Sequence, residues 1–328
     1  MRHAPLLALV GPTASGKTEA ALDVAGRLGA EIVSIDSMLV YRGMDVGTAK
    51  PTAAERALVP HHLLDVADPG LPFTVSEFQR LALHALGEVR ARGRNALLVG
   101  GSGLYFRAVV DGLSFPATDP TVRTELEAEA VGAGAGAMYE RLRALDPAAA
   151  AKIEPGNVRR TIRALEVVAL TGRPFSSFAG SWGRYPKDRV RAAGVELRPE
   201  DLRARIESRV HGMVEAGFVS EVEALLDLGT GPMLTSSQAI GYAEIARHLS
   251  GESTLEDAIL STIRRTRVLA RRQMSWFRRD PRISWFLAGA DGAAGIVEDI
   301  VEYLGSDLAG SDLAPAGPVR HPQRATDG

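Results

Sequence analysis

The sequence predicts an α/β protein in which a parallel sheet is flanked by helices and interrupted by an all-helical insertion. Three observations support this fold class. Apolar runs of strand length alternate with helical patterns over residues 6–99. A glycine-rich motif joins the first of these runs to the first helix. From Thr121 to about Gly180 only helical patterns occur, and a strand pattern returns at Arg191–Leu197.

Composition narrows the class of protein. The 328 residues suffice for one large domain or two, and 45% hydrophobic with 24% charged residues is the balance of an ordinary soluble protein. The chain has no cysteine, which excludes disulfides and thiolate metal sites. No apolar run reaches the roughly 18 residues of a membrane span, and the N-terminal run is too short for a signal peptide. We therefore expect a cytoplasmic protein without membrane contact, and no obligate protein partner is evident.

The segment Gly11–Thr18 fits the phosphate-binding pattern G-x-x-x-x-G-K-[ST], between a strand pattern at Leu6–Val10 and a helical pattern from Glu19. Glycines let successive backbone N–H groups converge on an anion, at which the N-terminus of the next helix also points. Lys17 would add a point charge, and the Thr18 hydroxyl would hold Mg²⁺. The expected diphosphate-binding or nucleotide-binding residues are Gly11, Pro12, Thr13, Ala14, Ser15, Gly16, Lys17 and Thr18. A glycine-rich turn without a ligand is the alternative.

A second strand, Glu31–Ile35, leads into Asp36. Asp36 is thus expected at the same edge of the sheet as Gly11–Thr18, the phosphate-binding loop or P-loop. From this position Asp36 is a candidate for a magnesium ligand, a helix N-cap or a general base. A third strand, Ala96–Val99, ends in the glycine-rich run Gly100–Tyr105. This run indicates either a backbone that approaches a ligand or another loop closely, or a plain tight turn.

The helical insertion is predicted at residues 115–188, between core segments 1–114 and 189–304, and residues 305–328 are predicted to be a disordered tail. Within the insertion, Arg159, Arg160 and Arg163 lie near the start of a predicted helix, where basic residues oppose the helix dipole. Either a bound polyanion or partner carboxylates would account for them.

Arginines also cluster in the last part of the chain. A predicted helix carries Arg205 and Arg209 four residues apart on one face, as in the lid of a nucleotide kinase. Salt bridges are the alternative, with Glu200, Asp201 and Glu207 as partners. Ser253–Glu256 has the pattern of a capping box that begins a helix ending near Arg279. The arginines predicted to form a stripe along it are Arg264, Arg267, Arg271 and Arg278.

Together these motifs resemble those of the bacterial tRNA dimethylallyltransferases, over residues 6 to about 286. The segments that carry the resemblance are Gly11–Thr18, Asp36–Pro51, Pro60–Asp65, Gly100–Tyr105, Arg159–Val167, Arg205–Arg209, Gln238–Tyr242 and Arg271–Trp276. The block Asp36–Pro51 is far more specific than the phosphate-binding loop. The chain departs from the family pattern at Gly156 and Ala243, and each departure would remove one RNA contact.

The resemblance implies transfer of a dimethylallyl group from dimethylallyl diphosphate to the N6 amine of the adenosine 3′-adjacent to the anticodon, in tRNAs that read codons beginning with U. It implies that Asp36 accepts the N6 proton, that Thr13 helps to orient the reacting groups, and that Arg205 closes over the phosphates, with Mg²⁺ as cofactor on Thr18. The residues implied to bind the tRNA anticodon stem-loop are Asp36, Ser37, Met38, Leu39, Ser102, Arg123, Arg159, Arg160, Arg163 and Gln238.

Three other functions share parts of this pattern. A small-molecule or nucleotide kinase would share the loop, the sheet and the arginine helix, but it would leave Asp36–Pro51 and the basic insertion unexplained. An enzyme that prenylates free adenine nucleotides would not need an insertion that holds RNA. A non-catalytic RNA-binding NTPase would not need Asp36 beside a complete P-loop.

Overall fold

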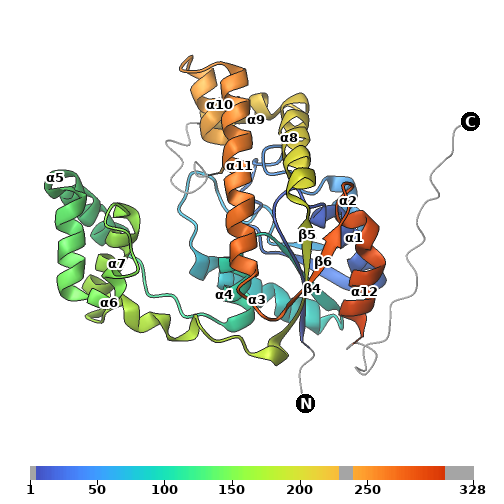
Figure 1. Ribbon diagram of the computed structural model, residues 1–328, viewed down its shortest axis with the longest axis horizontal. Helices are drawn as coiled ribbons and strands as arrows, with labels where there is room; N and C mark the ends of the chain where they lie inside the picture. The colour runs from blue at the N-terminus through green and yellow to red at the C-terminus, as the bar shows by residue number, and fades with distance from the viewer. Residues whose placement is uncertain (1–4, 229–238, 307–328) are drawn as a thin grey trace, which may run out of the picture. The chain divides into compact units, whose positions relative to one another are not determined.

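The computed structural model describes residues 5–228 and 239–306, and the chain divides into two compact units (Figure 1). One unit is residues 111–184, and the other is formed by the segments on either side of it. The predicted insertion, residues 115–188, covers nearly the same segment. The predicted tail lies almost entirely outside the described residues.

A six-stranded, fully parallel sheet forms the centre of the larger unit. Its order is β3-β2-β4-β1-β5-β6. The bounds are β1 Leu6–Val10, β2 Ala30–Ser34, β3 His61–His62, β4 Asn95–Gly100, β5 Val190–Leu197 and β6 Ile283–Ala288. The predicted fold class is therefore confirmed. The sequence patterns did not indicate the two edge strands, because β3 is only two residues long and β6 contains Ser284 and Trp285 in a mixed pattern.

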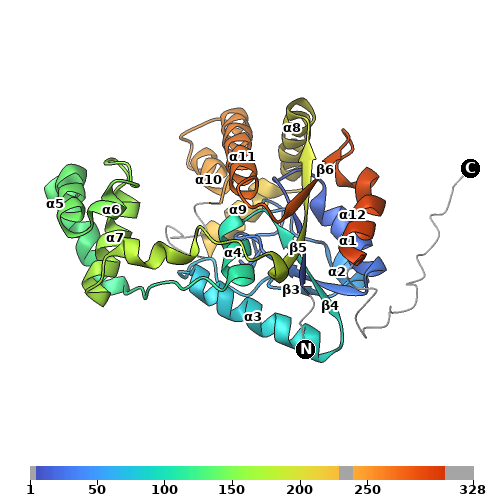
Figure 2. The same cartoon turned by 60° about the horizontal axis from the view of Figure 1, so that its bottom comes forward.

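Helices cover both faces of this sheet (Figure 2). Leu7 and Leu9 of β1 pack in one apolar cluster with α1 and α12, whereas Ala8 and Val10 face the opposite way, into a cluster with α3 and α4. This alternation is the two-residue period of a strand buried on both faces. The helices of this unit are α1 Lys17–Arg27, α2 Ala53–Leu58, α3 Val75–Ala91, α4 Gly103–Asp111, α8 Pro199–Glu215, α9 Phe218–Asp227, α10 Tyr242–Leu249, α11 Leu255–Phe277 and α12 Val297–Gly305.

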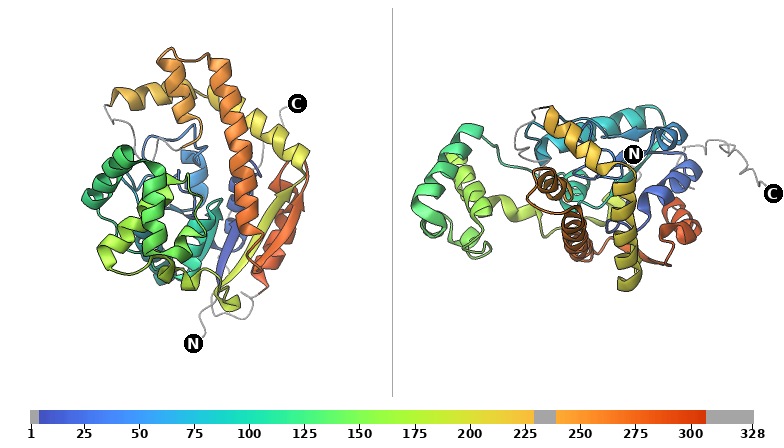
Figure 3. Two further views of the ribbon diagram at one scale, coloured as in Figure 1. Left: turned by 60° about the vertical axis from the view of Figure 1, so that its left-hand side comes forward. Right: turned by 90° about the horizontal axis from the view of Figure 1, so that it is seen from above.

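Two long helices, α8 and α11, lie side by side near the phosphate-binding loop (Figure 3). Ile206 and Val210 of α8 pack against Ile263 and Ala270 of α11, and Ala14 of the loop belongs to the same apolar cluster. The predicted capping box of α11 is wrong by one residue, because the side chain of Thr254, not that of Ser253, accepts the N–H of Asp257. The cluster fixes the arginine-bearing helix α8 against the P-loop.

The smaller unit is all-helical, with α5 Pro120–Leu145, α6 Pro147–Ala150 and α7 Val158–Thr171 around its own apolar core. Leu126, Leu142 and Leu165 are buried in that core. Helix α5 is interrupted at Gly134, whose φ of 83° lies in the left-handed region that glycine adopts readily. The described residues of this unit contain no strand, as the sequence predicted.

Candidate active site

The carboxyl ends of three neighbouring strands bring the predicted reaction centre together. The P-loop follows β1, Asp36 follows β2, and Gly100–Ser102 ends β4, which lies between the other two strands. Parallel strands place their carboxyl ends at one edge of a sheet, where ligands bind. At this edge lies a pocket of about 680 Å³, lined by Thr13–Glu19, Asp36, residues 48–51 and side chains from α8 and α11.

The P-loop has the backbone that its glycines predict. Gly16, the N-cap of α1, has φ 82°, and Ala14 has φ 63°, a left-handed conformation that is uncommon for a residue with a Cβ atom. A Cβ atom on Gly11, where φ is 152°, would lie 2.7 Å from the carbonyl oxygen of Val195 in β5. Left-handed residues that alternate with residues of ordinary backbone conformation turn successive N–H groups inward and form an anion-binding nest.

Lys17 is the buried cation of this loop, with 8% of its surface exposed. Its Nζ donates to the carbonyl oxygen of Pro12 at 2.5 Å and to Ser15 Oγ at 3.3 Å. Burial and the charge of Arg209 together lower the pKa of Lys17 to about 7, although the charge of Asp36 opposes them. A bound anion would favour the protonated form.

Helix α8 supplies two guanidinium groups to the pocket. Arg205 Nε donates to the carbonyl oxygen of Ala14 at 2.8 Å, and Arg209 donates to that of Thr48 at 3.2 Å. Among the described residues neither arginine pairs with Glu200, Asp201 or Glu207, so the salt-bridge alternative is wrong for both. Burial lowers the pKa of Arg209, and the charge of Asp36 counters that effect. Sequence reasoning placed Arg205 in the site; Arg209 was present in the same motif, four residues on.

Asp36 lies in a turn, and the helix-cap alternative is wrong, because the next helix along the chain, α2, begins only at Ala53. Its Oδ1 accepts the backbone N–H of Met38 at 2.8 Å, and its own N–H donates to Ser34 Oγ at 3.3 Å. One carboxylate oxygen therefore fixes the turn, while the side chain lines the pocket. The Met38 N–H also ties down the backbone of the predicted tRNA-contact segment, Asp36–Leu39.

Gln273 of α11 is a residue of the site that sequence reasoning did not single out. Its Oε1 accepts the backbone N–H of Thr13 at 2.8 Å, which anchors the loop at the residue expected to orient the reacting groups. A Cβ atom on Gly101 would lie 2.3 Å from Gln273 Nε2, and one on Gly103 would lie 2.7 Å from the ring of Trp276. The glycine run after β4 thus allows another segment, helix α11, to approach closely. Gln273 lies within Arg271–Trp276, one of the segments that carry the family resemblance, and that position was the available sequence signal for it.

Thr18 lies in the first turn of α1 and lines the same pocket as Asp36. Its hydroxyl has no hydrogen-bond partner among the described residues. Those residues also contain no group of three or more acidic, histidine or cysteine side chains able to hold a metal ion. Mg²⁺ is usually bound by one or two protein oxygens together with substrate phosphates and water, so this donor set fits Mg²⁺ carried with a diphosphate.

The remaining predicted tRNA contacts in the larger unit have mixed positions. Ser37, Met38 and Leu39 are half-buried beside Asp36. Ser102 lies just before α4, where its Oγ accepts the N–H of Tyr105 at 3.3 Å. Gln238 lies outside the described residues.

In the helical unit, two predicted RNA contacts bind a carboxylate of the protein. Glu166 is fully buried and accepts hydrogen bonds from Arg123 at 2.6 Å, Arg163 at 2.8 Å and the N–H of Asp119 at 3.0 Å. Burial alone would raise the pKa of Glu166, but the two arginines and the Asp119 N–H together outweigh it and lower the pKa. The partner-carboxylate alternative thus applies to Arg163. Arg159 and Arg160 are exposed.

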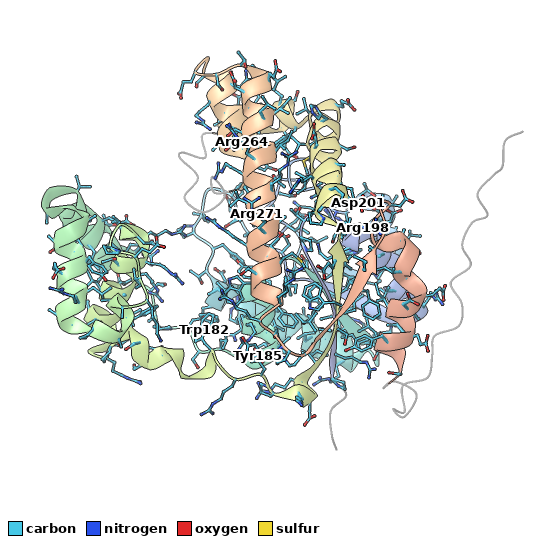
Figure 4. The ribbon with its side chains drawn as sticks, in the orientation of Figure 1. Trp182, Tyr185, Arg198, Asp201, Arg264 and Arg271 are labelled. Carbon is cyan, nitrogen blue, oxygen red and sulfur yellow. The ribbon has the colours of Figure 1, made fainter. Side chains whose placement is uncertain are left out.

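Of the four arginines predicted to form a stripe on α11, two pair with carboxylates of the protein and two do not, within the described part of the chain. Arg267 pairs with Glu207 at 3.1 Å, and Arg278 pairs with Glu196. Arg264 and Arg271 are exposed along the helix (Figure 4). Among the described residues, these two have no acidic partner.

The fold and site define a P-loop protein in which an aspartate and two arginines line a pocket beside the P-loop. The model of the family described as IPP transferase matches residues 39–280, and that of isopentenyl transferase matches residues 4–66. The chain belongs to the IPP transferase family.

Curated relatives and solved structures agree with this assignment. The tRNA dimethylallyltransferase of Nocardioides sp. is 49% identical, over 93% of this chain and 97% of the relative. That of Streptomyces coelicolor is 48% identical, over 87% and 90%. The crystal structure of a tRNA isopentenylpyrophosphate transferase from Bacillus halodurans is 41% identical, with a TM-score of 0.68 over 94% of this chain and 97% of that chain. A eukaryotic dimethylallyltransferase, 23% identical with a TM-score of 0.76, covers 95% of this chain and 82% of its own, and shares the fold. No helix among the described residues is long and apolar enough to cross a membrane.

Proposed function

We propose that this protein is an enzyme that transfers a dimethylallyl group from dimethylallyl diphosphate to the N6 amine of the adenosine 3′-adjacent to the anticodon of tRNA. The observation that carries the proposal is the convergence of the P-loop, Asp36 and the arginines of α8 on one pocket. The names of its close relatives support the substrate pair. The proposal keeps two expectations from the sequence. The substrate tRNAs are those that read codons beginning with U, and the protein acts in the cytoplasm.

The phosphate-binding half of the pocket stabilises the leaving group. The backbone N–H groups of the loop, Lys17 and Arg205 bind the diphosphate, whose negative charge grows as the bond from C1 of the allyl group to oxygen breaks. Preorganised donors of this kind commonly supply the largest share of rate enhancement, roughly 10²–10³-fold for a single donor. Arg205 already contacts the loop through Ala14, so its guanidinium requires little rearrangement.

The other half of the pocket activates the nucleophile. The N6 lone pair is delocalised into the adenine ring, so N6 must lose a proton as it forms the bond to C1. Asp36 accepts that proton and becomes neutral, while diphosphate departs. General base catalysis of this kind contributes roughly 10²–10⁴-fold. Thr13, anchored by Gln273, orients the reacting groups from the loop side.

Mg²⁺ would be held by the Thr18 hydroxyl together with the diphosphate oxygens. When bound, it would neutralise charge on the leaving group.

The RNA must present its adenosine unstacked, because the target amine is otherwise covered in the anticodon loop. Asp36–Leu39 and Ser102 would position the extruded base. Arginines of the helical unit would hold the stem through phosphate contacts, which carry no sequence information. Arg159 and Arg160 are the exposed members of this predicted set, and Arg123 and Arg163 contact Glu166.

The function is tested by incubating the protein with bulk bacterial tRNA lacking this modification and with dimethylallyl diphosphate, followed by mass analysis of the nucleosides. We expect one adenosine per substrate tRNA to gain a dimethylallyl group. Parallel reactions with ATP alone, and with free AMP as acceptor, test phosphoryl transfer and nucleotide prenylation. Turnover in either of those, without modified tRNA, would contradict the proposal.

Binding of tRNA should depend strongly on salt, because phosphate contacts release counterions. Arg159→Ala and Arg160→Ala should each lower the slope of log affinity against log salt by about one. Arg163→Ala should instead lower the unfolding temperature, because it removes one cation from the buried Glu166. Arg90→Ala on the exposed end of α3 is the matched control. Slopes unchanged from this control would remove Arg159 and Arg160 from the RNA interface.

A further inference from the structure

Glu221 of α9 holds a pocket-lining loop through four hydrogen bonds. Its Oε2 accepts the backbone N–H groups of Asp45 at 2.7 Å and Val46 at 2.6 Å. Its Oε1 accepts the N–H of Gly47 at 3.0 Å and the hydroxyl of Tyr242 at 2.7 Å. Three successive N–H groups that converge on one anion form a nest, which here is filled by a carboxylate of the protein itself.

This carboxylate is not part of an ordinary surface ion pair. Among the described residues Glu221 has no arginine or lysine partner, and Lys50 of the same loop is paired with Asp45 and Asp65. Burial raises the pKa of Tyr242, and the charge of Glu221 raises it further, so the phenol stays protonated and donates. The Glu221 carboxylate therefore accepts hydrogen bonds only from backbone N–H groups and one phenol among the described residues. Such bonds to a carboxylate are strong and directional.

The nest is one end of a compact turn whose other end lines the pocket. The N–H of Ala49 donates to Val46 at 3.0 Å, and that of Lys50 donates to Asp45 at 2.9 Å. Thr48, Ala49 and Lys50 all line the pocket. The position of the Thr48 carbonyl, which accepts Arg209, therefore follows from the position of residues 45–47.

Helix α9 also fits this turn sterically. A Cβ atom on Gly47 would lie 2.1 Å from the ring of Phe218, and the Phe218 and Tyr242 rings meet edge to face at 5.0 Å. The turn is thus held from one side by α9 and α10, and from the other by the buried Lys50 amine, which donates to the Tyr41 carbonyl oxygen at 2.7 Å.

We propose that Glu221 is a positioning residue for the transfer reaction: by fixing residues 45–47 it places the Thr48 carbonyl, which in turn aims Arg209 at the leaving diphosphate beside Lys17 and Asp36. This inference rests on the proposed function. The Thr48 carbonyl is the one hydrogen-bond partner of Arg209 among the described residues, and Arg209 lines the pocket, so its remaining N–H groups are available to a phosphate.

The test compares Glu221→Gln with Glu223→Gln, the same change two residues away at an exposed position of α9. Glutamine keeps the size of the side chain but removes the charge and turns an N–H₂ group toward backbone donors. We expect the single-turnover rate of Glu221→Gln to fall on the order of 10- to 100-fold, the effect of a small misplacement of a catalytic group. Equal rates for the two variants would overturn the proposal.

A double-mutant cycle with Arg209→Ala separates positioning from a general loss of structure. If Glu221 acts through Arg209, Glu221→Gln lowers the single-turnover rate of the otherwise wild-type protein. The same substitution then has little further effect on the rate of Arg209→Ala. A full, multiplicative effect in the Arg209→Ala background would overturn the proposal. If Glu221→Gln does not fold, Tyr242→Phe, which removes one donor to the same carboxylate, enters the cycle with the same two outcomes.

Inorganic pyrophosphate gives the cycle a readout that does not need the transfer reaction. Its dissociation constant, measured by calorimetry, should rise on Glu221→Gln in the wild-type background and stay unchanged in the Arg209→Ala background. Additive weakening would overturn the positioning role. A wild-type protein that binds pyrophosphate but modifies no tRNA would instead contradict the proposed function, so the two failures are distinguishable.

Discussion

Replacing Asp36 by asparagine is expected to slow the chemical step by at least about 10²-fold while leaving both substrates bound. Asparagine is nearly isosteric, and its amide oxygen can still accept the Met38 N–H that Oδ1 accepts at 2.8 Å. The turn should therefore survive, and only the proton acceptor is lost. Single-turnover rates at saturating tRNA and dimethylallyl diphosphate measure this step directly.

The control for Asp36→Asn is Asp23→Asn, the same chemical change at an exposed position of α1. It should leave the rate unchanged. If the group lost is a general base, the residual rate of Asp36→Asn should rise with pH as hydroxide takes over the proton. A near-normal rate would mean that Asp36 only shapes the turn and that another group accepts the proton.

The parts of the site that could be predicted are those whose residues lie close together along the chain. The P-loop shows its strand, glycines and helix within about twenty residues, and Asp36 follows directly from the end of an apolar run. A parallel sheet then brings both to one edge, because every strand end in it points the same way. The exposed Arg159 and Arg160 are also local features.

The parts that could not be predicted depend on contacts between distant segments. Thr13 and Gln273 are 260 positions apart, and Val46 and Glu221 are 175 apart. Neither residue of such a pair carries a local signal for the other. The two edge strands were missed for a related reason, since pairing to β2 and β5 decides them more than their own composition does. By contrast, Glu166 lies three positions from Arg163, and that spacing on a helix could have indicated the pair.

Replacing Lys17 by methionine is expected to weaken pyrophosphate binding on the order of 10- to 100-fold near neutral pH, since a hydrogen bond to a charged group contributes roughly 1.5–3 kcal/mol. Methionine keeps the unbranched apolar stem that packs in this buried position. The rate of transfer should fall as well, because the same ammonium stabilises the leaving diphosphate. Wild-type affinity and rate in this variant would contradict the assignment of the P-loop.

The pH dependence of that binding separates the charge of Lys17 from its shape. Burial, the charge of Arg209 and the opposing charge of Asp36 set the pKa of Lys17 at about 7 in the empty pocket, so the amine is charged below that pH and increasingly neutral above it. A bound diphosphate raises this pKa, so binding above pH 7 must take up a proton, and affinity should fall by up to about tenfold per pH unit. The ligand's own titration is common to both proteins, so the wild-type slope minus that of Lys17→Met reports the lysine alone. Calorimetry in buffers of different ionisation enthalpy should detect the proton taken up by the wild type and none in the variant beyond the ligand's share. Equal slopes would mean that Lys17 keeps its charge throughout and binds the diphosphate without a change of protonation.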